Sequence, residues 1–243
     1  MINKPLKIEQ SPIFWRIMGI VNGVCMMVLL LRFAFMVPAV NLWFYRWQYA
    51  ANDTYRHVDM LPADLHEVTR HMIRYMQGRE ADLQIETVVG GETRYFFSEI
   101  EIRHMIDVYD LFSVGLILQN ALIFLFVLTL AAFVIWGRER LCYLLRSWQI
   151  GSAFVFLSLA LLVLVIAINW HHAFVVFHEI FFDNDYWILD PRIDLLINIV
   201  PYPFFITISV FIGGFFAAGL VLMFAVSTVV LRKWSGKWRT NAG

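Results

Sequence analysis

The sequence predicts an all-α membrane protein with four transmembrane helices and a small α+β extracytoplasmic cap. Hydrophobic residues make up 60% of the 243 residues, charged residues make up 16%, and the mean hydropathy is +0.67. This composition is far more apolar than that of soluble domains. Four apolar stretches are long enough for the ~20 residues that a helix needs to cross a bilayer, at roughly 17–37, 111–136, 150–169 and 204–231.

The distribution of charge predicts the orientation of these helices. The formal net charge is zero, so no basic excess draws the chain to nucleic acid. Lysine and arginine are concentrated in membrane-flanking loops that stay in the cytoplasm. Here they gather in the N-terminal arm, the second-to-third connection and the tail: Lys4, Lys7, Arg16, Arg138, Arg140, Arg146, Arg232, Lys233, Lys237 and Arg239. We therefore expect cytoplasmic termini and an extracytoplasmic location for all seven histidines.

These boundaries divide the chain into five parts. The first is an arm and helix at 1–40, followed by the cap at 41–110 and the second and third helices at 111–169. An extracytoplasmic loop at 170–203 completes the site, and the fourth helix and tail occupy 204–243.

The cap segment contains signals for each of its elements. An aromatic cluster over Asn41–Tyr49 is typical of the headgroup layer. Pro62 opens a helical pattern that Gly78 stops. Two short runs at 83–89 and 92–97 flank Gly90-Gly91 and predict a β-hairpin. The apolar positions of the predicted helix are Leu65, Val68, Met72, Ile73 and Met76.

Two further helices are expected on the outer side. Ser98 and Glu101 form a capping box. This box predicts a helix that begins at 99 and continues without a break into the second span. The apolar run Ile193–Val200 is too short to cross a bilayer, and we expect it to form a re-entrant or surface-lying helix that contacts the cap.

Two histidines are the main candidates for chemistry. At about 1.5 Å per residue, His104 lies ~10 Å above the apolar boundary, and His178 lies ~13 Å above it if the third span continues as one helix. Glu101 and Asp107 are each three residues from His104, and Glu179 is next to His178. Such carboxylates can fix the tautomer of an imidazole, although pairing with Arg103 or Arg94 is the alternative.

The same residues also bear on other chemistries. His178-Glu179 resembles the start of a zinc-protease His-Glu-x-x-His helix, but Phe182 occupies the second ligand position. Ligation of a metal or haem by His171, His172 and His178 stays open, and it is the alternative function. Neither cysteine lies on the outer side, and no outer serine lies in a Gly-x-Ser-x-Gly sequence. We therefore expect no covalent acyl-enzyme, and the preferred function uses neither a metal nor a cofactor.

Four motifs stand out on the outer side of the predicted membrane: Phe97–Val108, Phe177–Trp187, Asp190–Ile197 and Pro201–Phe205. They closely resemble those of the lipoprotein intramolecular transacylase (Lit) family of bacterial membrane proteins. The resemblance implies four transmembrane helices in the bacterial cell membrane, an extracellular cap, and two catalytic histidines where the cap meets the membrane. By motif these histidines are His104 and His178.

The resemblance also implies a reaction and a partner. The sn-2 acyl chain of a diacylglyceryl-modified lipoprotein moves to the α-amino group of its own N-terminal cysteine, which leaves a lyso-form lipoprotein. One histidine would accept the amine proton and the other would stabilise the oxyanion, with the assignment left open. The side chains would then lie ~5–9 Å apart. Membrane lipid is the other expected partner. Residues expected to bind or orient the substrate are Arg32, Glu101, Arg103, Asp107, Phe177, Phe181, Asn184 and Trp187.

Overall fold

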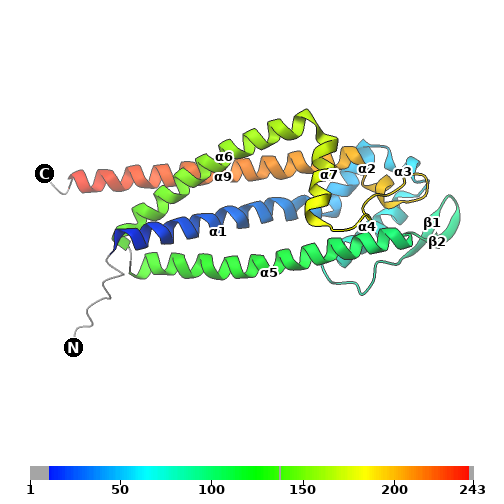
Figure 1. The fold of residues 1–243 in the computed structure, drawn as a ribbon, viewed down its shortest axis with the longest axis horizontal. Helices are drawn as coiled ribbons and strands as arrows, with labels where there is room; N and C mark the ends of the chain where they lie inside the picture. Colours follow the sequence, from blue (N-terminus) through cyan, green and yellow to red (C-terminus); the bar gives the residue numbers. More distant parts are fainter. Residues whose placement is uncertain (1–10, 137, 241–243) are drawn as a thin grey trace. The chain divides into compact units, whose positions relative to one another are not determined.

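A computed structural model describes residues 11–136 and 138–240 (Figure 1). Lys4 and Lys7 lie outside the described residues, as do the side chains of Arg138, Lys237 and Arg239. The regular elements are α1 (Pro12–Ala39), α2 (Leu42–Ala51), α3 (Thr54–His57), α4 (Pro62–Met76), β1 (Glu86–Val89), β2 (Glu92–Tyr95), α5 (Glu99–Ile135), a 3-10 turn (Arg138–Arg140), α6 (Leu141–Ile168), α7 (Trp170–Phe181), α8 (Leu196–Ile199) and α9 (Tyr202–Thr240).

Four of the described helices are long and apolar enough to cross a membrane. They are α1, α5, α6 and α9, with mean hydropathies between 2.2 and 2.8 over their most apolar windows. Each covers one of the four predicted spans, so the predicted number and order of the membrane helices are confirmed. At most 22% of the residues in each window are buried inside the protein, because a membrane helix presents to lipid the apolar side chains that a soluble protein would bury.

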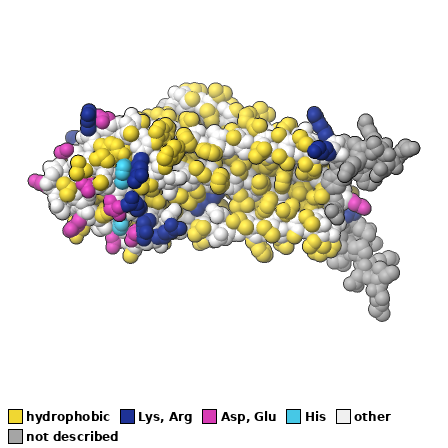
Figure 2. Space-filling model, turned by 180° about the vertical axis from the view of Figure 1, so that it is seen from behind, with side chains coloured by type: hydrophobic (Ala, Val, Ile, Leu, Met, Phe, Trp, Pro, Cys, Tyr) yellow, Lys and Arg dark blue, Asp and Glu magenta, His cyan; other side chains and the backbone are white. Residues whose placement is uncertain are grey.

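The chain divides into two compact units, and each of the four long helices contributes to both. The bundle unit comprises 1–33, 119–165 and 213–243. The mixed unit comprises 34–118 and 166–212, and it holds the hairpin and all the short helices. On the face drawn in Figure 2, hydrophobic side chains cover the long helices, whereas most acidic side chains and the visible histidines gather over the mixed unit.

Close packing and a buried polar network join the helices of the bundle unit. A Cβ on Gly219 of α9 would lie 2.6 Å from both methyl groups of Leu30 on α1, so a small residue lets the helices approach. The Asn22 side chain is fully buried on α1, and its amide donates to Thr129 Oγ1 (2.8 Å) on α5. Trp148 Nε1 of α6 donates to Asn22 Oδ1 (3.1 Å). One side chain therefore links three helices.

We expect Asn22→Ala to destabilise the bundle. The substitution leaves Trp148 Nε1 without its acceptor and Thr129 without its donor, and interhelical hydrogen bonds in membranes contribute about 0.6–1.7 kcal/mol each. The free energy of unfolding in detergent should fall by about 1–3 kcal/mol. Asn120→Ala on the exposed face of α5 is the matched control, and an equal loss in that variant would contradict the assignment.

The core of the mixed unit is built largely from the segment predicted to form the cap. Helix α4 has the predicted bounds and buries all five predicted apolar positions. The aromatic cluster of 41–49 divides between two environments. Phe44 and Tyr45 pack on Phe204 at the start of α9 (ring centroids 5.5 and 5.1 Å), whereas Trp43 and Trp47 are exposed and stack on each other. Only the two tryptophans therefore fit the predicted headgroup position.

The predicted hairpin and helix start are confirmed. Strands β1 and β2 pair in antiparallel register, with Val89 opposite Glu92. Gly90 and Gly91 both have positive φ (60° and 82°), which a two-residue hairpin turn requires. At the start of α5, Ser98 N donates to Glu101 Oε2 (2.6 Å), and Glu101 N donates to Ser98 Oγ (3.4 Å). Helix α5 then continues to Ile135 without interruption.

Two predictions for the outer loop are wrong. The third span does not continue to His178, because α6 ends at Ile168 and Asn169 (φ −148°) caps a separate helix, α7, with a side-chain hydrogen bond to His172 N. The apolar run at 193–200 does not form a helix over its length. It forms a single turn, α8, whose Leu196 and Ile199 are buried in the core of the mixed unit. Contact with the cap segment is confirmed.

Candidate active site

The mixed unit brings His104 and His178 together from separate helices. The two imidazole centroids are 6.2 Å apart, and the ring planes are inclined by 37°. His104 lies in the second turn of α5 and His178 lies in the last turn of α7. This separation of the two rings falls within the predicted range of ~5–9 Å, which could hold an ester and an amine between the side chains.

One hydrogen bond determines the tautomer of His178. The imidazole is buried, and Nδ1 lies 2.7 Å from the carbonyl oxygen of Phe174, one turn earlier on α7. Because a carbonyl can only accept, Nδ1 carries the proton. In the neutral ring Nε2 is therefore the lone-pair nitrogen. Burial lowers the pKa of His178 below its usual value of 6.5, and the bond to the Phe174 carbonyl opposes this shift.

His104 has a different environment. Its Nδ1 atom is buried and has no hydrogen-bond partner among the described residues. No carboxylate within 11–136 or 138–240 accepts a hydrogen bond from either imidazole. An unpaired buried nitrogen costs free energy. This cost is a reason to expect a bound molecule to supply a partner at His104.

Aromatic rings enclose the histidine pair. Trp187 stacks on His178, with centroids 4.7 Å apart and planes inclined by 28°. Phe182 contacts both imidazoles, at 5.3 Å from His104 and 5.7 Å from His178. Phe177 and Phe181 pack against each other and remain about half exposed (48% and 49%). The predicted aromatic wall therefore has an inner part against the imidazoles and an outer part open to the surroundings.

The carboxylates expected to orient the imidazoles contact other groups. Glu101 is fully buried, and its oxygens accept the backbone N–H groups of Ser98 and Leu196. Asp107 Oδ2 accepts the Asn184 amide (2.9 Å). Glu179 is exposed. The backbone carbonyl of Phe174 has the orienting role that the sequence analysis gave to a carboxylate.

The two arginines of the predicted site have partners elsewhere. Arg103 is exposed, forms an ion pair with Glu99 (2.5 Å) and lies over the ring of Tyr186. The predicted alternative, in which Arg103 pairs with a carboxylate next to one of the histidines, is therefore wrong, because its partner is Glu99. Arg32 belongs to the bundle unit, where its Nε donates to Gln119 Oε1 (3.2 Å). A substrate contact for either arginine stays a prediction.

The structure does not assemble the alternative ligand set. His171 and His172 are exposed. The described residues contain no group of three or more histidine, cysteine, aspartate or glutamate side chains positioned to bind a metal ion. The Nδ1 of His178 is occupied by the Phe174 carbonyl. No observation therefore favours ligation over proton transfer.

Two features of the site were not predicted from the sequence: the buried Asp194, and the contact of Phe182 with both imidazoles. Asp194 is buried (3% exposed), and its Oδ1 accepts the Ser98 hydroxyl (3.0 Å). No local pattern pairs these residues, because 96 positions separate them along the chain. The one available signal was the Asp190-Pro191 sequence shortly before Asp194, because Asp and Pro favour structured turns.

Comparison with known protein families shows the family of this chain. The model of "Lipoprotein intramolecular transacylase Lit" matches residues 20–205, a range that includes both histidines. The chain belongs to the Lit family. No curated protein matches the chain in sequence.

Solved structures of a Lit protein show the same fold. The membrane integral lipoprotein intramolecular transacylase Lit from Bacillus cereus superposes with a TM-score of 0.80 at 22% identity, covering 93% of this chain and 99% of that one. A variant of that protein with a histidine-to-arginine substitution gives 0.72 at 21% identity, covering 92% and 94%. Lit membership, together with four apolar helices, identifies a multi-pass membrane transacylase.

Proposed function

We propose that this Lit protein transfers the sn-2 acyl chain of a diacylglyceryl lipoprotein to the α-amino group of the lipoprotein's own N-terminal cysteine. The observation that supports the proposal is the pair of imidazoles, 6.2 Å apart, on separate helices. Ester and amine belong to one substrate, so the main requirement is to hold them in a near-attack geometry. Such positioning can lower a barrier by about 7–11 kcal/mol.

His178 is the general base in this proposal. Its Nδ1 proton is directed at the Phe174 carbonyl, so the lone pair on Nε2 is available to take a proton from the attacking amine. The imidazolium that forms keeps its bond to that carbonyl. It also lies in the last turn of α7, where the helix dipole favours a cation by about 0.3–1 kcal/mol.

His104 stabilises the oxyanion. The amine nitrogen attacks the ester carbonyl carbon, and an imidazole N–H of His104 donates to the oxygen that becomes negative. The bond between that carbon and the glyceryl oxygen then breaks, and the proton held by His178 passes to the leaving oxygen. The net result is one N-acyl bond formed, one ester bond broken and one proton moved from nitrogen to oxygen.

The residues around the pair suit an acyl substrate. Phe177 and Phe181 offer half-exposed apolar rings beside the histidines for the acyl chain. Phe182 and Trp187 limit the access of water to the imidazoles. In the membrane, the site would lie on the extracytoplasmic side with both termini in the cytoplasm, as the distribution of lysine and arginine predicts. Arg32 and Arg103 remain candidates for contact with the lipid headgroup.

A crossover experiment tests the reaction. Purified protein receives a mixture of two diacylglyceryl lipopeptides, one deuterated in both its peptide and its sn-2 chain and one unlabelled. We expect mass spectrometry to show N-acylated lyso-form products that are either fully labelled or fully unlabelled. Products that combine a labelled acyl chain with an unlabelled peptide would contradict intramolecular transfer. Release of free fatty acid without N-acylation would contradict acyl transfer to the amine.

The pH dependence of kcat/KM should have two acid limbs. The free α-amino group titrates at about 7.7–8.0, so log kcat/KM should fall with a slope of about one below that range. Burial lowers the pKa of His178, so protonation of this base should steepen the slope only below its usual value of 6.5. The second limb should be absent in His178→Ala. A second limb above pH 6.5 in the wild-type enzyme would contradict the assignment of His178.

A further inference from the structure

The segment 182–200, which follows α7 and includes α8, is joined to α5 on both sides of His104. One attachment point is Glu101 and the other is Asp107, each three residues from His104 on the same helix. Trp187, which stacks on His178, lies between the two residues of the segment that are held, Asn184 and Leu196. Helix α5 therefore carries one histidine and also holds the segment that supports the other.

The attachment at Glu101 is buried and uses both carboxylate oxygens. A capping box needs only one of them, and Oε2 fills that role by accepting Ser98 N–H (2.6 Å). The other oxygen, Oε1, accepts the N–H of Leu196 (2.5 Å), 95 positions further along the chain. Hydrogen bonds to a charged acceptor are about twice as strong as those between neutral groups. Glu101 thus connects the first turn of α5 to the first residue of α8.

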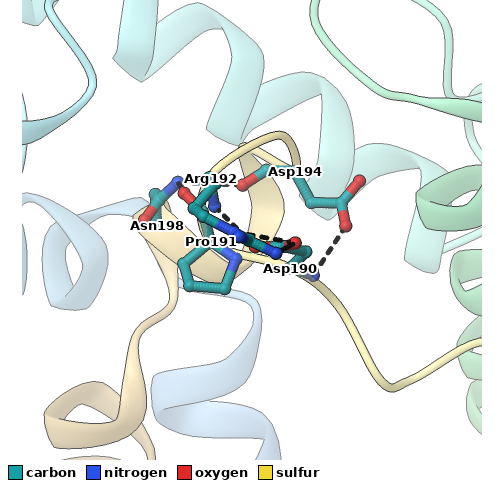
Figure 3. A network of polar contacts seen from close by, with 5 residues as sticks. All are labelled: Asp190, Pro191, Arg192, Asp194 and Asn198. Carbon is teal, nitrogen blue, oxygen red and sulfur yellow. Dashed lines mark hydrogen bonds and ion pairs between the residues drawn. The ribbon is translucent and has the colours of Figure 1, made fainter.

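A second buried carboxylate strengthens this attachment. Asp194 accepts the Ser98 hydroxyl through Oδ1 (3.0 Å) and the N–H of Asp190 through Oδ2 (2.8 Å). Figure 3 shows Asp194 directed at Asp190, with Asn198 on the opposite side of the turn. Asn198 closes the turn by donating to the carbonyl oxygens of Pro191 (2.8 Å) and Asp194 (2.9 Å). These hydrogen bonds close the turn and join it to the start of α5 through Ser98.

The attachment at Asp107 is nearer to α7. The Asn184 amide donates to Asp107 Oδ2 (2.9 Å), and Asn184 Oδ1 accepts the N–H of Tyr186 (3.0 Å). The next residue is Trp187. Trp187 thus lies between two attached residues of the segment, Asn184 and Leu196, and its indole packs against the face of the His178 ring.

We propose that Glu101 is a positioning residue, which fixes the separation of His104 and His178 by holding the 182–200 segment, and with it Trp187, against α5. The proposal rests on the proposed function. It differs from the sequence-based expectation, because the carboxylate acts through the loop backbone and not on an imidazole.

Glu101→Gln tests the proposal with little change in volume. The amide nitrogen must face either Ser98 N–H or Leu196 N–H, so one of these two hydrogen bonds is lost. Misplacement of reacting groups by about 1 Å can cost about 10²-fold in rate. We expect kcat to fall by about ten- to a hundredfold with KM changed less than threefold. The matched control is Glu99→Gln, which removes an exposed carboxylate from the same helical turn and should leave kcat within about twofold.

A double-mutant cycle separates positioning from general destabilisation. If Glu101 acts through Trp187, then Glu101→Gln should slow the Trp187→Leu enzyme by less than about twofold, because residues that act as one unit are not additive. Additive losses, or full activity of Glu101→Gln alone, would overturn the proposal. If Glu101→Gln fails to fold, Asn184→Ala takes its place in the same cycle, since it releases the segment from the other side of His104.

Hydrogen exchange provides a measurement that does not depend on activity. In Glu101→Gln, peptides covering 182–200 should exchange their backbone amides faster than in wild type, whereas peptides from α4 should not change. Faster exchange confined to 182–200 would support the attachment whether or not the protein is a transacylase. Failure of the wild-type protein to make lyso-form product would refute only the proposed function. Unchanged exchange would overturn the attachment itself.

Discussion

His178→Ala should lower kcat for lyso-form production by about 10²- to 10⁴-fold, the usual contribution of a positioned general base. The lone-pair nitrogen that accepts the amine proton is lost, and so is the ring between Phe174 and Trp187. His178→Gln should be equally inactive, because a carboxamide cannot take up a proton near neutral pH. The measurement is the initial rate of N-acylated product by mass spectrometry, with membrane insertion checked by gel filtration in detergent.

His172→Ala is the matched control for this experiment. This exposed histidine lies on the same helix as His178, and its removal should leave the rate unchanged. The control also tests the alternative function, because ligation by the outer histidines predicts that His172 contributes. Activity of His178→Ala within tenfold of wild type would refute the assignment of His178 as the base.

His104→Ala should lower kcat by about 10²- to 10³-fold, as expected when a donor to an oxyanion is removed. His104→Gln should recover part of this loss, because its amide N–H can still donate to the developing negative charge. The two histidines therefore predict different responses to the same substitution. Glutamine should restore activity at position 104 and should not restore it at position 178.

The assignment of roles depends on that difference. If His104→Gln is as slow as His104→Ala while His178→Gln keeps activity, the roles of the two histidines are reversed. The hydrogen bond from His178 Nδ1 to the Phe174 carbonyl supports the role of His178 as the base, because it leaves the lone pair on Nε2. His104 has no such bond at its Nδ1 atom within the described residues.

Most of the secondary structure could be predicted because its signals are local. The four membrane spans depend on hydropathy over about 20 residues. The α4 helix depends on Pro62, Gly78 and a 3.6-residue apolar pattern, and the hairpin depends on Gly90-Gly91. The start of α5 depends on Ser98 and Glu101. Each signal lies within the element that it determines.

The third span ends within one residue of its predicted end, but the continuous helix assumed as far as His178 does not form. Trp170-His171-His172 ends the apolar run, yet it contains no proline or glycine that would indicate a helix break. The break depends on the Asn169 side chain, which caps α7 by accepting the N–H of His172. An asparagine can cap a helix or lie within one, and sequence periodicity does not distinguish the two cases.

The membrane helices, α4, the hairpin, the start of α5 and the two histidines that the family motifs mark could all be predicted from the sequence. Which groups touch those histidines depends on tertiary packing. The Phe174 carbonyl replaced the expected carboxylates, Trp187 and Phe182 came to lie on the rings, and Glu101 turned out to bond the backbone of α8. The contacts at His104 and Glu101 could not be predicted because they join residues that are far apart in the sequence. Helix and turn signals act over a few neighbouring residues, whereas these contacts join positions that are brought together only by packing in the core of the mixed unit.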